Sequence, residues 1–499
     1  MIATHAAVSR FKPLAASGSA VRRNSRYVNA APKRPSIAPK LSINIKHIRE
    51  NPDLYTKTCN DRNYLAQKAN PQRIIQLFNA SNQLRVDARD VRRRNNHIQD
   101  RLEVLRRSEA HEQGTTIDEQ DQLLLEAETL KPSLNRISSS EADLDHEIES
   151  LAAELPNLTS EETPIGKEPR LLGYINKRPE ISTLVNHVDI GKDLGLLDFA
   201  AASTTSGWGW YFLKDEGALL EQALIQYALS VAIRHGFSVV SPPSMVYSHI
   251  ASACGFQPRD QGGEQQSYMI AQPEKPSPFE SAREGKPGLT LAGTAEIPFA
   301  AMKANTTLQD RELPLQIVGA SRCYRAEAGA RGIDTKGLYR VHEFTKVEMF
   351  SWITKGKEVA AFESLLAVQK EILQSLGLHC RILEMPSTDL GASATRKVDI
   401  EAFFPSRRAK DDGYGEVTSA SICTDYQTRR LNTRLKLASP GQTKTDFPYT
   451  VNGTALAVPR ILAALLENGW NQEQKVVKIP EVLHSWMHGT RTIEKKPDC

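Results

Sequence analysis

Two long stretches of the chain carry hydrophobic residues at alternating spacings of three and four, namely residues 74–105 and 123–155. This heptad spacing places the apolar residues on one side of an α-helix, and two such sides pack together as a coiled coil. The segment between the stretches is polar and contains Gly114. We therefore expect an antiparallel coiled-coil hairpin whose helices are each roughly 45 Å long, at 1.5 Å per residue.

The charges of this expected hairpin are divided between its two helices. Residues 85–107 contain eight arginines and four acids, whereas residues 118–154 contain eleven acids and two bases. Two explanations remain open at this point. The arginines pair with the acids of the other helix, or those that point away form a stripe that contacts nucleic-acid phosphates. No aromatic residue is interleaved, so such a stripe would recognise backbone or shape without base stacking.

The pattern changes at residues 156–169, which are polar and contain proline and glycine. Short helical and strand patterns are mixed beyond this segment, so we place a domain boundary here. One amphipathic helix is expected at about residues 216–235, and Gly236 ends it as glycine ends many helices. A short apolar strand follows and ends at Pro242-Pro243.

Residues 324–350 have the pattern of two strands joined by a loop. We expect residues 324–327 to end one strand, the basic, glycine-containing segment 328–337 to form the loop, and residues 338–350 to form the returning strand. Side chains alternate between the two faces of a strand. One face should carry Arg340, His342, Phe344, Lys346, Glu348 and Phe350, and the other Val341, Glu343, Thr345, Val347 and Met349.

This alternation decides between two kinds of site. His342 and Glu343 are residue types that bind zinc, but alternation points them in opposite directions, so they cannot chelate one metal ion. Phe344 and Glu348 share a face and lie about 13 Å apart at 3.3 Å per residue. An aromatic ring and a carboxylate at that separation suit the two ends of one ligand. Arg325 is expected to share a face of the preceding strand with Glu327.

Two further segments carry polar residues with ligand-binding chemistry. Thr294 and Glu296 flank Ala295, and they suit either a small ligand's ammonium or hydroxyl group or a helix N-cap; the local sequence leaves both open. Glu416 and Ser419 offer oxygen atoms of the kind that Mg²⁺ prefers.

A third segment places a charge in an apolar pattern. Residues 452–454 are expected to open a helix in which Arg460 lies one or two turns in, and an arginine there needs an anionic partner. The sequence has neither a P-loop nor a G-x-G-x-x-G motif, so any nucleotide site is of another type.

Composition limits the class of protein and its compartment. Hydrophobic residues make up 40% and charged residues 24%, as in ordinary globular domains. No run approaches the roughly 20 apolar residues of a membrane span. The six cysteines form no C-x-x-C pair, which favours reduced thiols. Residues 1–40 contain eight basic residues and no acid, are rich in alanine and serine, and predict a mitochondrial transit peptide; a disordered basic tail is the alternative.

Taken together, the motifs resemble those of class II aminoacyl-tRNA synthetases, specifically the seryl-tRNA synthetases. The resemblance extends from about Ile43 to the mid-480s. It rests on the two-helix arm, T-A-E at 294–296, R-x-E and Y-R-V-H-x-F-x-K-V-E at 325–348, E-x-x-S and C-T-D-x-Q-x-R-R at 416–430, and N-G-x-x-L-A-V-x-R at 452–460.

The resemblance implies an α+β fold, with an N-terminal antiparallel coiled-coil hairpin followed by a class II catalytic domain built on an antiparallel sheet flanked by helices. We divide the chain into a transit peptide (1–40), a tRNA-binding domain (41–160) and a catalytic domain (161–499). The implied activity is that of a ligase. Such a ligase activates L-serine with ATP, which gives seryl-adenylate and pyrophosphate. It then transfers serine to the 3′ end of tRNA(Ser), here in the mitochondrial matrix. A catalytically inactive synthetase-like module that binds RNA or protein is the alternative.

The resemblance also implies a role for individual residues. The serine pocket would contain Thr294, Ala295, Glu296, Glu348 and Thr454. The ATP site would contain Arg325, Ala326, Glu327, Val341, Phe344, Glu416, Val417, Thr418, Ser419 and Arg460. Of these, Arg325, Glu327 and Arg460 would be catalytic, and Glu416 and Ser419 would hold Mg²⁺. The arm would contact tRNA through Arg85, Arg89, Arg92, Arg93 and Arg101.

Two surfaces are implied as well. The loop 328–337 would meet the acceptor end of the tRNA. The helix that ends at Gly236 and the strand before Pro242-Pro243 would form a homodimer interface. Thr454 and Pro459 depart from the family's usual Ser and Gly, which puts serine affinity in doubt.

Overall fold

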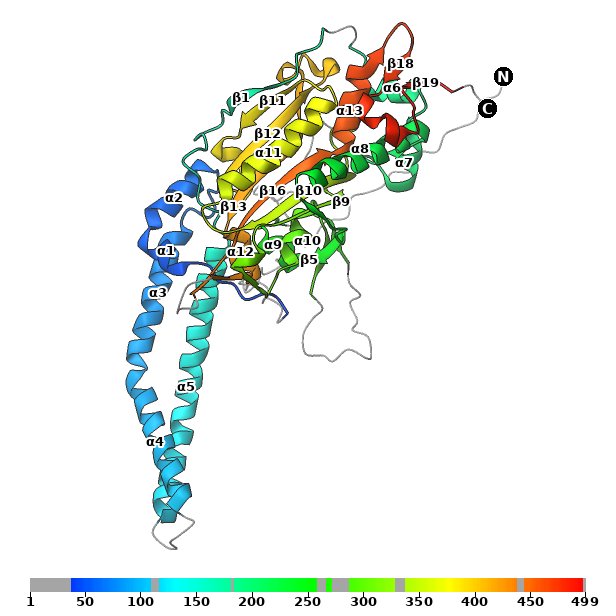
Figure 1. The fold of residues 1–499 in the computed structure, drawn as a ribbon. Coiled ribbons are helices and arrows are strands. Elements are labelled where there is room, and N and C mark those ends of the chain that lie inside the picture. The colour runs from blue at the N-terminus through cyan, green and yellow to red at the C-terminus, as the bar shows by residue number, and fades with distance from the viewer. Residues whose placement is uncertain are drawn as a thin grey trace, which may run out of the picture. The chain divides into compact units, whose positions relative to one another are not determined.

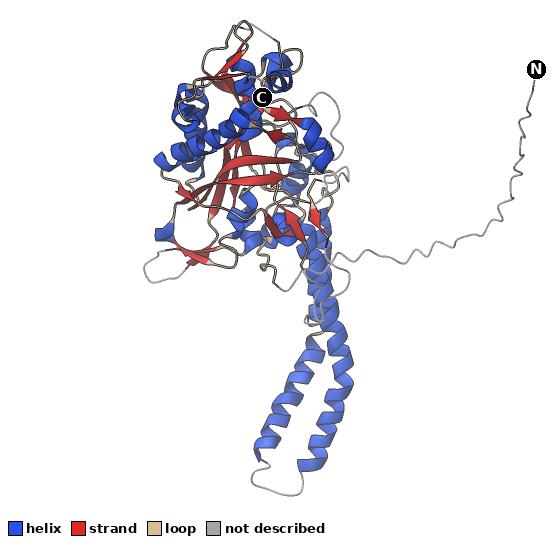
Figure 2. Cartoon of the chain, turned by 90° about the vertical axis from the view of Figure 1, so that its right-hand side faces the viewer, coloured by secondary structure: helices blue, strands red, loops and turns tan. Residues whose placement is uncertain are grey.

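The N-terminal part of the structure consists of helices. The computed structural model describes residues 37–108, 116–180, 184–257, 266–271, 287–327, 337–437 and 444–496. The first helices are α1 (Ile45–Glu50), α2 (Pro52–Asp61), α3 (Asn70–Asp87), α4 (Arg89–Ser108) and α5 (Thr116–Ala153). α3 and α4 lie end to end beside α5 (Figure 1, Figure 2). The first predicted helix is therefore divided at Ala88, whereas the second is continuous although it contains Pro132.

The heptad positions lie between these helices, and none of them is exposed in either run. Ile98 and Leu102 of α4 pack against Leu123 of α5 in one apolar cluster. Nearer the base, Ile74 of α3 packs with Ile148 of α5 in another. The predicted apolar contact is thus confirmed, while its supercoiling stays a prediction.

Ion pairs join the helices along their length. The acid partner's number falls as the arginine's number rises, so the helices run antiparallel. The pairs are Arg73–Glu147 (2.9 Å), Arg85–Asp145 (3.2 Å), Arg92–Glu141 (2.5 Å), Arg94–Glu126 (2.5 Å) and Arg101–Glu119 (2.8 Å). Interhelical pairing therefore accounts for three of the five arginines that were assigned to a tRNA-binding stripe.

Hydrogen bonds attach the base of the helices to the rest of the chain. The guanidinium group of Arg62, which is buried, donates to the carbonyl oxygens of Asn157 and Gly391. The amide nitrogen of Asn157 donates in turn to the carbonyl oxygens of Ser393 and Cys423, at 2.8 Å each. Part of the predicted linker is therefore fixed to the sheet domain.

An eight-stranded sheet forms the centre of the C-terminal part. Its order is β1-β11-β12-β13-β16-β10-β9-β4, and it is antiparallel except where β4 runs parallel to β9. This sheet, with its helices, confirms the predicted α+β class. The strands are β1 (Arg170–Ile175), β11 (Cys380–Glu384), β12 (Arg396–Phe403), β13 (Tyr414–Thr424), β16 (Tyr449–Ala457), β10 (Glu343–Ile353), β9 (Leu315–Tyr324) and β4 (Ser238–Val239).

Helices lie against the two faces of the sheet. On one face lie α8 (Asp215–Arg234), α11 (Glu358–Ser375) and α13 (Val458–Gly469) (Figure 1). Val347 and Met349 of β10 join the apolar cluster on this face. Phe350 and Trp352 instead pack with α9 (Ser248–Ala253), α10 (Glu296–Ala301) and α12 (Tyr426–Leu431). Since alternate residues point the same way, Glu348 belongs to this second face.

The remaining described elements are shorter. They are α6 (His187–Asp193), α7 (Phe199–Ser206), β2 (Leu197–Asp198), β3 (Phe212–Leu213), β5 (Met245–Tyr247), β6 (Met269–Ile270), β7 (Leu289–Leu291), β8 (Thr307–Gln309), β14 (Arg434–Leu437), β15 (Lys444–Asp446), β17 (Trp470–Asn471), β18 (Val476–Lys478) and β19 (Thr492–Glu494). None of the described helices is long and apolar enough to cross a bilayer.

Several predicted boundaries are wrong. β10 begins at Glu343, so residues 338–342 precede the strand, and β9 ends before Arg325. Residues 452–454 lie inside β16 and open no helix. α13 begins at Val458, which puts Arg460 in its first turn. Pro459 then takes a position where proline's missing N–H is harmless. Residues 1–36 and most of the loop 328–337 lie outside the described part.

Two of the β-bulges in the central strands shift residues that were assigned to the site. Between β12 and β13, Ile400 pairs with Thr418 but Glu401 pairs with Glu416, so β13 has one extra residue. Between β10 and β16, Val347 pairs with Leu456 but Glu348 pairs with Thr454.

A side chain from α11 satisfies the carbonyl groups near both bulges. The amide nitrogen of Gln369, which is fully buried, donates to the carbonyl oxygen of Ser419 at 2.8 Å and to that of Thr454 at 2.9 Å. The hydroxyl group of Thr418 also donates to the carbonyl oxygen of Thr454. Buried carbonyl groups without partners are costly, so Gln369 holds the irregular strands in place.

We predict that Gln369→Met, which nearly preserves volume, destabilises the protein by roughly 2–4 kcal/mol, because two buried carbonyl groups lose a donor. Urea unfolding measures the change. Gln374→Met on the exposed side of the same helix is the control and should stay within about 0.5 kcal/mol of wild type. Equal effects of the two substitutions would contradict this account of the bulges.

Candidate active site

A cavity on the sheet gathers most of the residues assigned to ATP. It lies among β10, β13, β16 and the start of α13. The predicted residues that line it are Arg325, Glu327, Val341, Phe344, Glu416, Val417, Thr418, Ser419, Thr454 and Arg460. Ala326 does not line it, and its N–H donates to the carbonyl oxygen of Gln266 at 3.0 Å.

The bulge in β13 explains how two predicted oxygen donors reach one cavity. Glu416 and Ser419 are three residues apart, which in a regular strand would put them on opposite faces. The extra residue reverses the alternation between them. Both therefore line the cavity, as the Mg²⁺ prediction requires.

The aromatic end of the cavity is Phe344. The guanidinium carbon of Arg325 lies 5.2 Å from the centre of its ring. Val341 packs in the same small apolar cluster as Phe344, together with Cys323. The predicted opposite orientation of Val341 is therefore wrong, because this residue precedes the strand, whereas its predicted position beside Phe344 fits the geometry.

The predicted serine pocket is buried and polar. Glu348 accepts a hydrogen bond from the hydroxyl group of Thr454 at 3.2 Å and pairs with the ammonium group of Lys346 at 2.7 Å. Glu296 accepts one from the amide group of Gln427 at 2.6 Å. All five residues are less than 9% exposed.

Thr294 lies one residue before the N-cap position of α10, so the predicted capping by Thr294 is wrong. Its hydroxyl oxygen still accepts a hydrogen bond from the N–H of Glu296 at 3.3 Å. Glu296 lies in the first turn of that helix, and Ala295 is the fully buried N-cap residue. This hydrogen bond uses only the backbone N–H of Glu296, whose carboxyl group lies in the electrostatic field of Glu348.

The two buried carboxylates compete for positive charge. Burial, followed by repulsion from Glu348, raises the pKa of Glu296 to about 8, although Lys346 lowers it in part. The ammonium group of Lys346 thus interacts with the carboxylates of both Glu348 and Glu296. The pocket suits a ligand that brings a second positive charge or a hydrogen-bond donor.

Arg460 and Glu416 form the opposite, charged end of the cavity. The guanidinium group of Arg460 lies 3.1 Å from the Glu416 carboxylate and donates to the carbonyl oxygens of Glu416 and Tyr339. Burial opposes ionisation of Glu416, but Arg460, Lys397 and Arg325 outweigh it and lower its pKa to about 2. Glu416 is therefore an anion at neutral pH, which suits a cation bound jointly with phosphate oxygens.

His342 and Glu343 are separated, as the alternation argument concluded. The Nδ1 atom of His342 lies 2.9 Å from the Tyr268 hydroxyl group, and its ring stacks on Trp210. Glu343 instead faces Arg322 at 3.6 Å. Within the described residues, no cluster of three or more His, Cys, Asp or Glu side chains could hold a metal ion.

A buried network fixes the chain next to Arg460. The Nδ1 atom of His187 lies 2.9 Å from the Glu467 carboxylate, which also accepts from the Tyr339 hydroxyl group at 2.8 Å. The Nε2 atom of His187 accepts from the N–H of Leu338 at 3.0 Å. Because the Tyr339 carbonyl group binds Arg460, this network orients the arginine.

Sequence reasoning missed four residues of the site. Lys346, Gln427 and Asn452 lie inside motifs that were noted, but they received no role. Lys346 pairs with Glu348 two residues further along β10, whereas the contacts of Gln427 and Asn452 with Glu296 join elements far apart in sequence. Tyr339 was missed for the same reason, since its partner Glu467 is 128 residues away.

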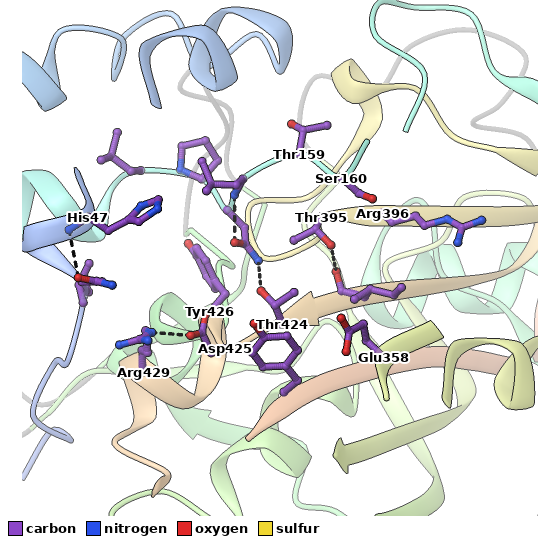
Figure 3. A pocket seen from close by; sticks show the side chains of 18 of the residues that line it. His47, Thr159, Ser160, Glu358, Thr395, Arg396, Thr424, Asp425, Tyr426 and Arg429 are labelled. Atoms are coloured by element: carbon purple, nitrogen blue, oxygen red, sulfur yellow. Dashed lines mark hydrogen bonds and ion pairs between the residues drawn. The ribbon is translucent and has the colours of Figure 1, made fainter. Parts of the chain in front are cut away.

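A separate cavity lies where α1, α12 and the segment after α5 meet (Figure 3). His47, Thr159, Arg396 and Asp425 are among its lining residues, and the Arg429 guanidinium group donates to Asp425 at 2.7 Å. None of the predicted site residues lines it. This cavity lies at the base of the arm and is separate from the predicted site.

Two of the five arginines that were assigned to tRNA binding have no acidic partner and lie together. Arg89 and Arg93 are exposed and form no ion pair with any described residue. They line a shallow hollow with Asn96 and His97. The structure thus divides the predicted stripe into paired and unpaired members.

Comparisons with known proteins agree with this arrangement. The chain matches the Seryl-tRNA synthetase N-terminal domain over residues 43–159 and the tRNA synthetase class II core domain (G, H, P, S and T) over residues 279–469. It is 41% identical over 368 residues to the mitochondrial serine–tRNA ligase of Saccharomyces cerevisiae. The aligned region covers 73% of this chain and 78% of the relative. It is 35% identical over 452 residues to the mitochondrial serine–tRNA ligase of Schizosaccharomyces pombe. This region covers 89% of this chain and 88% of the relative.

A solved structure of a seryl-tRNA synthetase has a similar fold. The seryl-tRNA synthetase from Pyrococcus horikoshii complexed with ATP is 30% identical to this chain. The similarity covers 91% of this chain and 100% of that one, with a TM-score of 0.77.

The raised pKa of Glu296 predicts a pH-dependent cost of folding. Between pH 4.5 and about 8 the folded state binds this proton more tightly than the unfolded state, so rising pH lowers stability through Glu296. Glu296→Gln removes the effect, and its melting temperature relative to wild type should rise steadily from pH 5 to pH 8. Differential scanning calorimetry measures this, with Glu149→Gln, an exposed site on α5, as a control. A difference that does not change with pH would contradict the assignment.

Proposed function

Because this chain belongs to the seryl-tRNA synthetase family, we propose that the cavity between Phe344 and Arg460 activates serine with ATP. Its activity is that of a serine–tRNA ligase, and the names of its mitochondrial relatives support a role in mitochondrial translation. One observation supports this site above others. Ten predicted ATP-site and serine-site residues, which the sequence scatters from Arg325 to Arg460, line one cavity.

In the proposed complex ATP lies along the cavity from Phe344 to Arg460. Its adenine ring stacks on Phe344 beside Val341, and Arg325 and Glu327 contact the phosphate and adenine regions. Arg460 binds the γ-phosphate, and its fixed orientation limits the positions that the polyphosphate takes. The backbone of residues 416–419, which includes Val417 and Thr418, forms one wall of the cavity.

Serine occupies the buried pocket next to this site. Its ammonium and hydroxyl groups meet Glu296, Glu348, Thr294 and Thr454, while Ala295 keeps the end of the pocket small. A pocket built to bind a hydroxyl group leaves its polar groups unpaired when alanine enters, so discrimination on the order of 10⁴ is expected.

The first reaction joins these two substrates. The serine carboxylate attacks the α-phosphorus of ATP in line, a new P–O bond forms, and the bond to the β-phosphate oxygen breaks to release pyrophosphate. Arg325 and Arg460 stabilise the charge that develops on the phosphates, and the rigid sheet keeps the reacting atoms aligned. Glu416 and Ser419 would hold Mg²⁺, which supplies further positive charge to the phosphates when bound.

The second reaction transfers the seryl group from seryl-adenylate to the terminal adenosine hydroxyl group of tRNA(Ser), which forms an ester bond and releases AMP. We assign the antiparallel arm to tRNA binding and assign Arg89 and Arg93 to the phosphate contact, since Arg85, Arg92 and Arg101 already pair with acids. The loop 328–337 would meet the acceptor end.

Location and assembly complete the proposal. Residues 1–40 are assigned as a transit peptide that directs the enzyme to the mitochondrial matrix. The homodimer interface is assigned to α8 and β4. Leu219, Ile233 and Val239 support this assignment, since 40–52% of each residue is exposed although all three are apolar.

The enzymatic proposal is tested by ATP–pyrophosphate exchange. Exchange should depend on serine and should be weaker with threonine, alanine or glycine by at least about 10³-fold. Arg460→Met should abolish it. Absence of exchange with serine, in a protein that still binds tRNA, would favour the inactive RNA-binding alternative.

The arm proposal is tested with charge-neutral variants. Arg89→Gln/Arg93→Gln should raise the KM for tRNA(Ser) by about tenfold and lower the salt slope of binding by about 2, because two phosphate contacts are lost. Serine-dependent exchange should not change. Arg101→Gln, whose arginine is paired with Glu119, should have a smaller effect. An equal or larger effect of Arg101→Gln would contradict the division of the arginines.

A further inference from the structure

A second cavity adjoins the proposed ATP site beyond Arg460. Tyr339, Arg340, Glu416 and Arg460 line both cavities. The ion pair between Arg460 and Glu416 therefore stands at their common boundary. Any group held by Arg460 lies at the entrance of the second cavity.

Positive charge predominates in this second cavity. Four arginines and two glutamates belong to its lining. Arg381 comes from β11 and Arg407 from the 3₁₀ turn η4 (Pro405–Arg407), so the cations converge from separate elements. A cavity lined mainly by one sign of charge attracts ligands of the opposite sign.

The guanidinium group of Arg381 is held at one edge only. Its Nε atom donates to the Glu401 carboxylate at 2.5 Å, and its carbon lies 4.4 Å from the centre of the Tyr414 ring. A guanidinium group has five N–H donors. The terminal nitrogens of Arg381 form no hydrogen bond to any other residue that the structure describes, which leaves them for oxygen atoms in the cavity.

Arg407 is the second arginine that lines this cavity without lining the proposed ATP site. Its guanidinium carbon lies 4.5 Å from the centre of the Tyr339 ring. The same tyrosine fixes Arg460 through its carbonyl oxygen. Tyr339 thus contacts both Arg407 and Arg460, and both arginines line the second cavity.

We propose that Arg381 and Arg407 form a binding site for the pyrophosphate product, through which it leaves after serine is activated. This inference rests on the proposed function. Arg460 holds the γ-phosphate, so the leaving diphosphate starts at the mouth of the second cavity, and its charge suits arginine forks. Pyrophosphate would enter through the same cavity when seryl-adenylate is converted back to serine and ATP.

The test uses the full-length enzyme in ATP–pyrophosphate exchange, which gives separate KM values for pyrophosphate, ATP and serine. Arg381→Met and Arg407→Met should each raise the KM for pyrophosphate by about tenfold. The KM values for ATP and serine should stay within about twofold. Arg178→Met is the matched control, because Arg178 also lies over Tyr414, at 5.8 Å, but does not line the cavity.

A second control separates binding from structure. Arg381 and Glu401 are paired across β11 and β12, so Arg381→Met also removes a cross-strand ion pair. Glu401→Gln removes the same pair but keeps the cation. It should leave the KM for pyrophosphate unchanged or lower it, whereas a rise equal to that of Arg381→Met would overturn the proposal.

Two further results would also overturn it. One is an unchanged KM for pyrophosphate in both arginine variants. The other is an equal rise in the KM for ATP, which would make them part of the ATP site. Isothermal titration calorimetry with inorganic pyrophosphate tests binding without turnover. Wild type that binds pyrophosphate more tightly than Arg381→Met, yet shows no serine-dependent exchange, would refute the proposed function alone. Equal affinities would refute the pyrophosphate site.

Discussion

The active site depends on satisfying two carbonyl groups in the interior of an irregular sheet. The bulges in β13 and β16 turn Glu416, Ser419 and Thr454 toward one cavity, but they also disturb the regular strand pairing. Gln369 supplies the missing donor to the carbonyl groups of Ser419 and Thr454. The packing of α11 on the sheet is therefore a condition for the geometry on the opposite face. Bulges are common beside active sites because they redirect single side chains without unfolding the strand.

Charge balance in the serine pocket follows from this geometry. Thr454 reaches Glu348 because the bulge shifts the pairing of β16, and Lys346 neutralises the same carboxylate. Glu296 remains without a cation of its own, and burial favours its protonated form. In the proposed complex the ammonium group of serine takes the place of that proton. Serine binding near neutral pH is then coupled to proton release from Glu296, which links affinity to the same desolvation that costs stability.

The sequence predicted the elements that depend on local periodicity, but it missed those that depend on register. The heptads located the arm contact, and strand alternation placed Phe344 and Glu348 on one face, because both patterns repeat over many residues. Alternation failed for Val341, which precedes the strand, and could not bring Glu416 and Ser419 together, because one inserted residue inverts it. The motif at 452–460 was read as a helix since its strand and helix are both apolar. The partners of Arg85 and Arg101 required the pairing between helices.

Arg460 connects these separate features. Its side chain is held by Glu416 on the bulged strand and by the Tyr339 carbonyl group, and Tyr339 is held by Glu467 together with His187. A first-turn arginine on α13 would otherwise be free to rotate among several positions. Since Arg460 lines both cavities, its orientation in the proposed complex determines where the γ-phosphate lies and in which direction pyrophosphate leaves. In the proposed complex the buried network around Glu467 therefore acts on substrate binding and product release through one side chain, although neither Glu467 nor His187 lines the cavity.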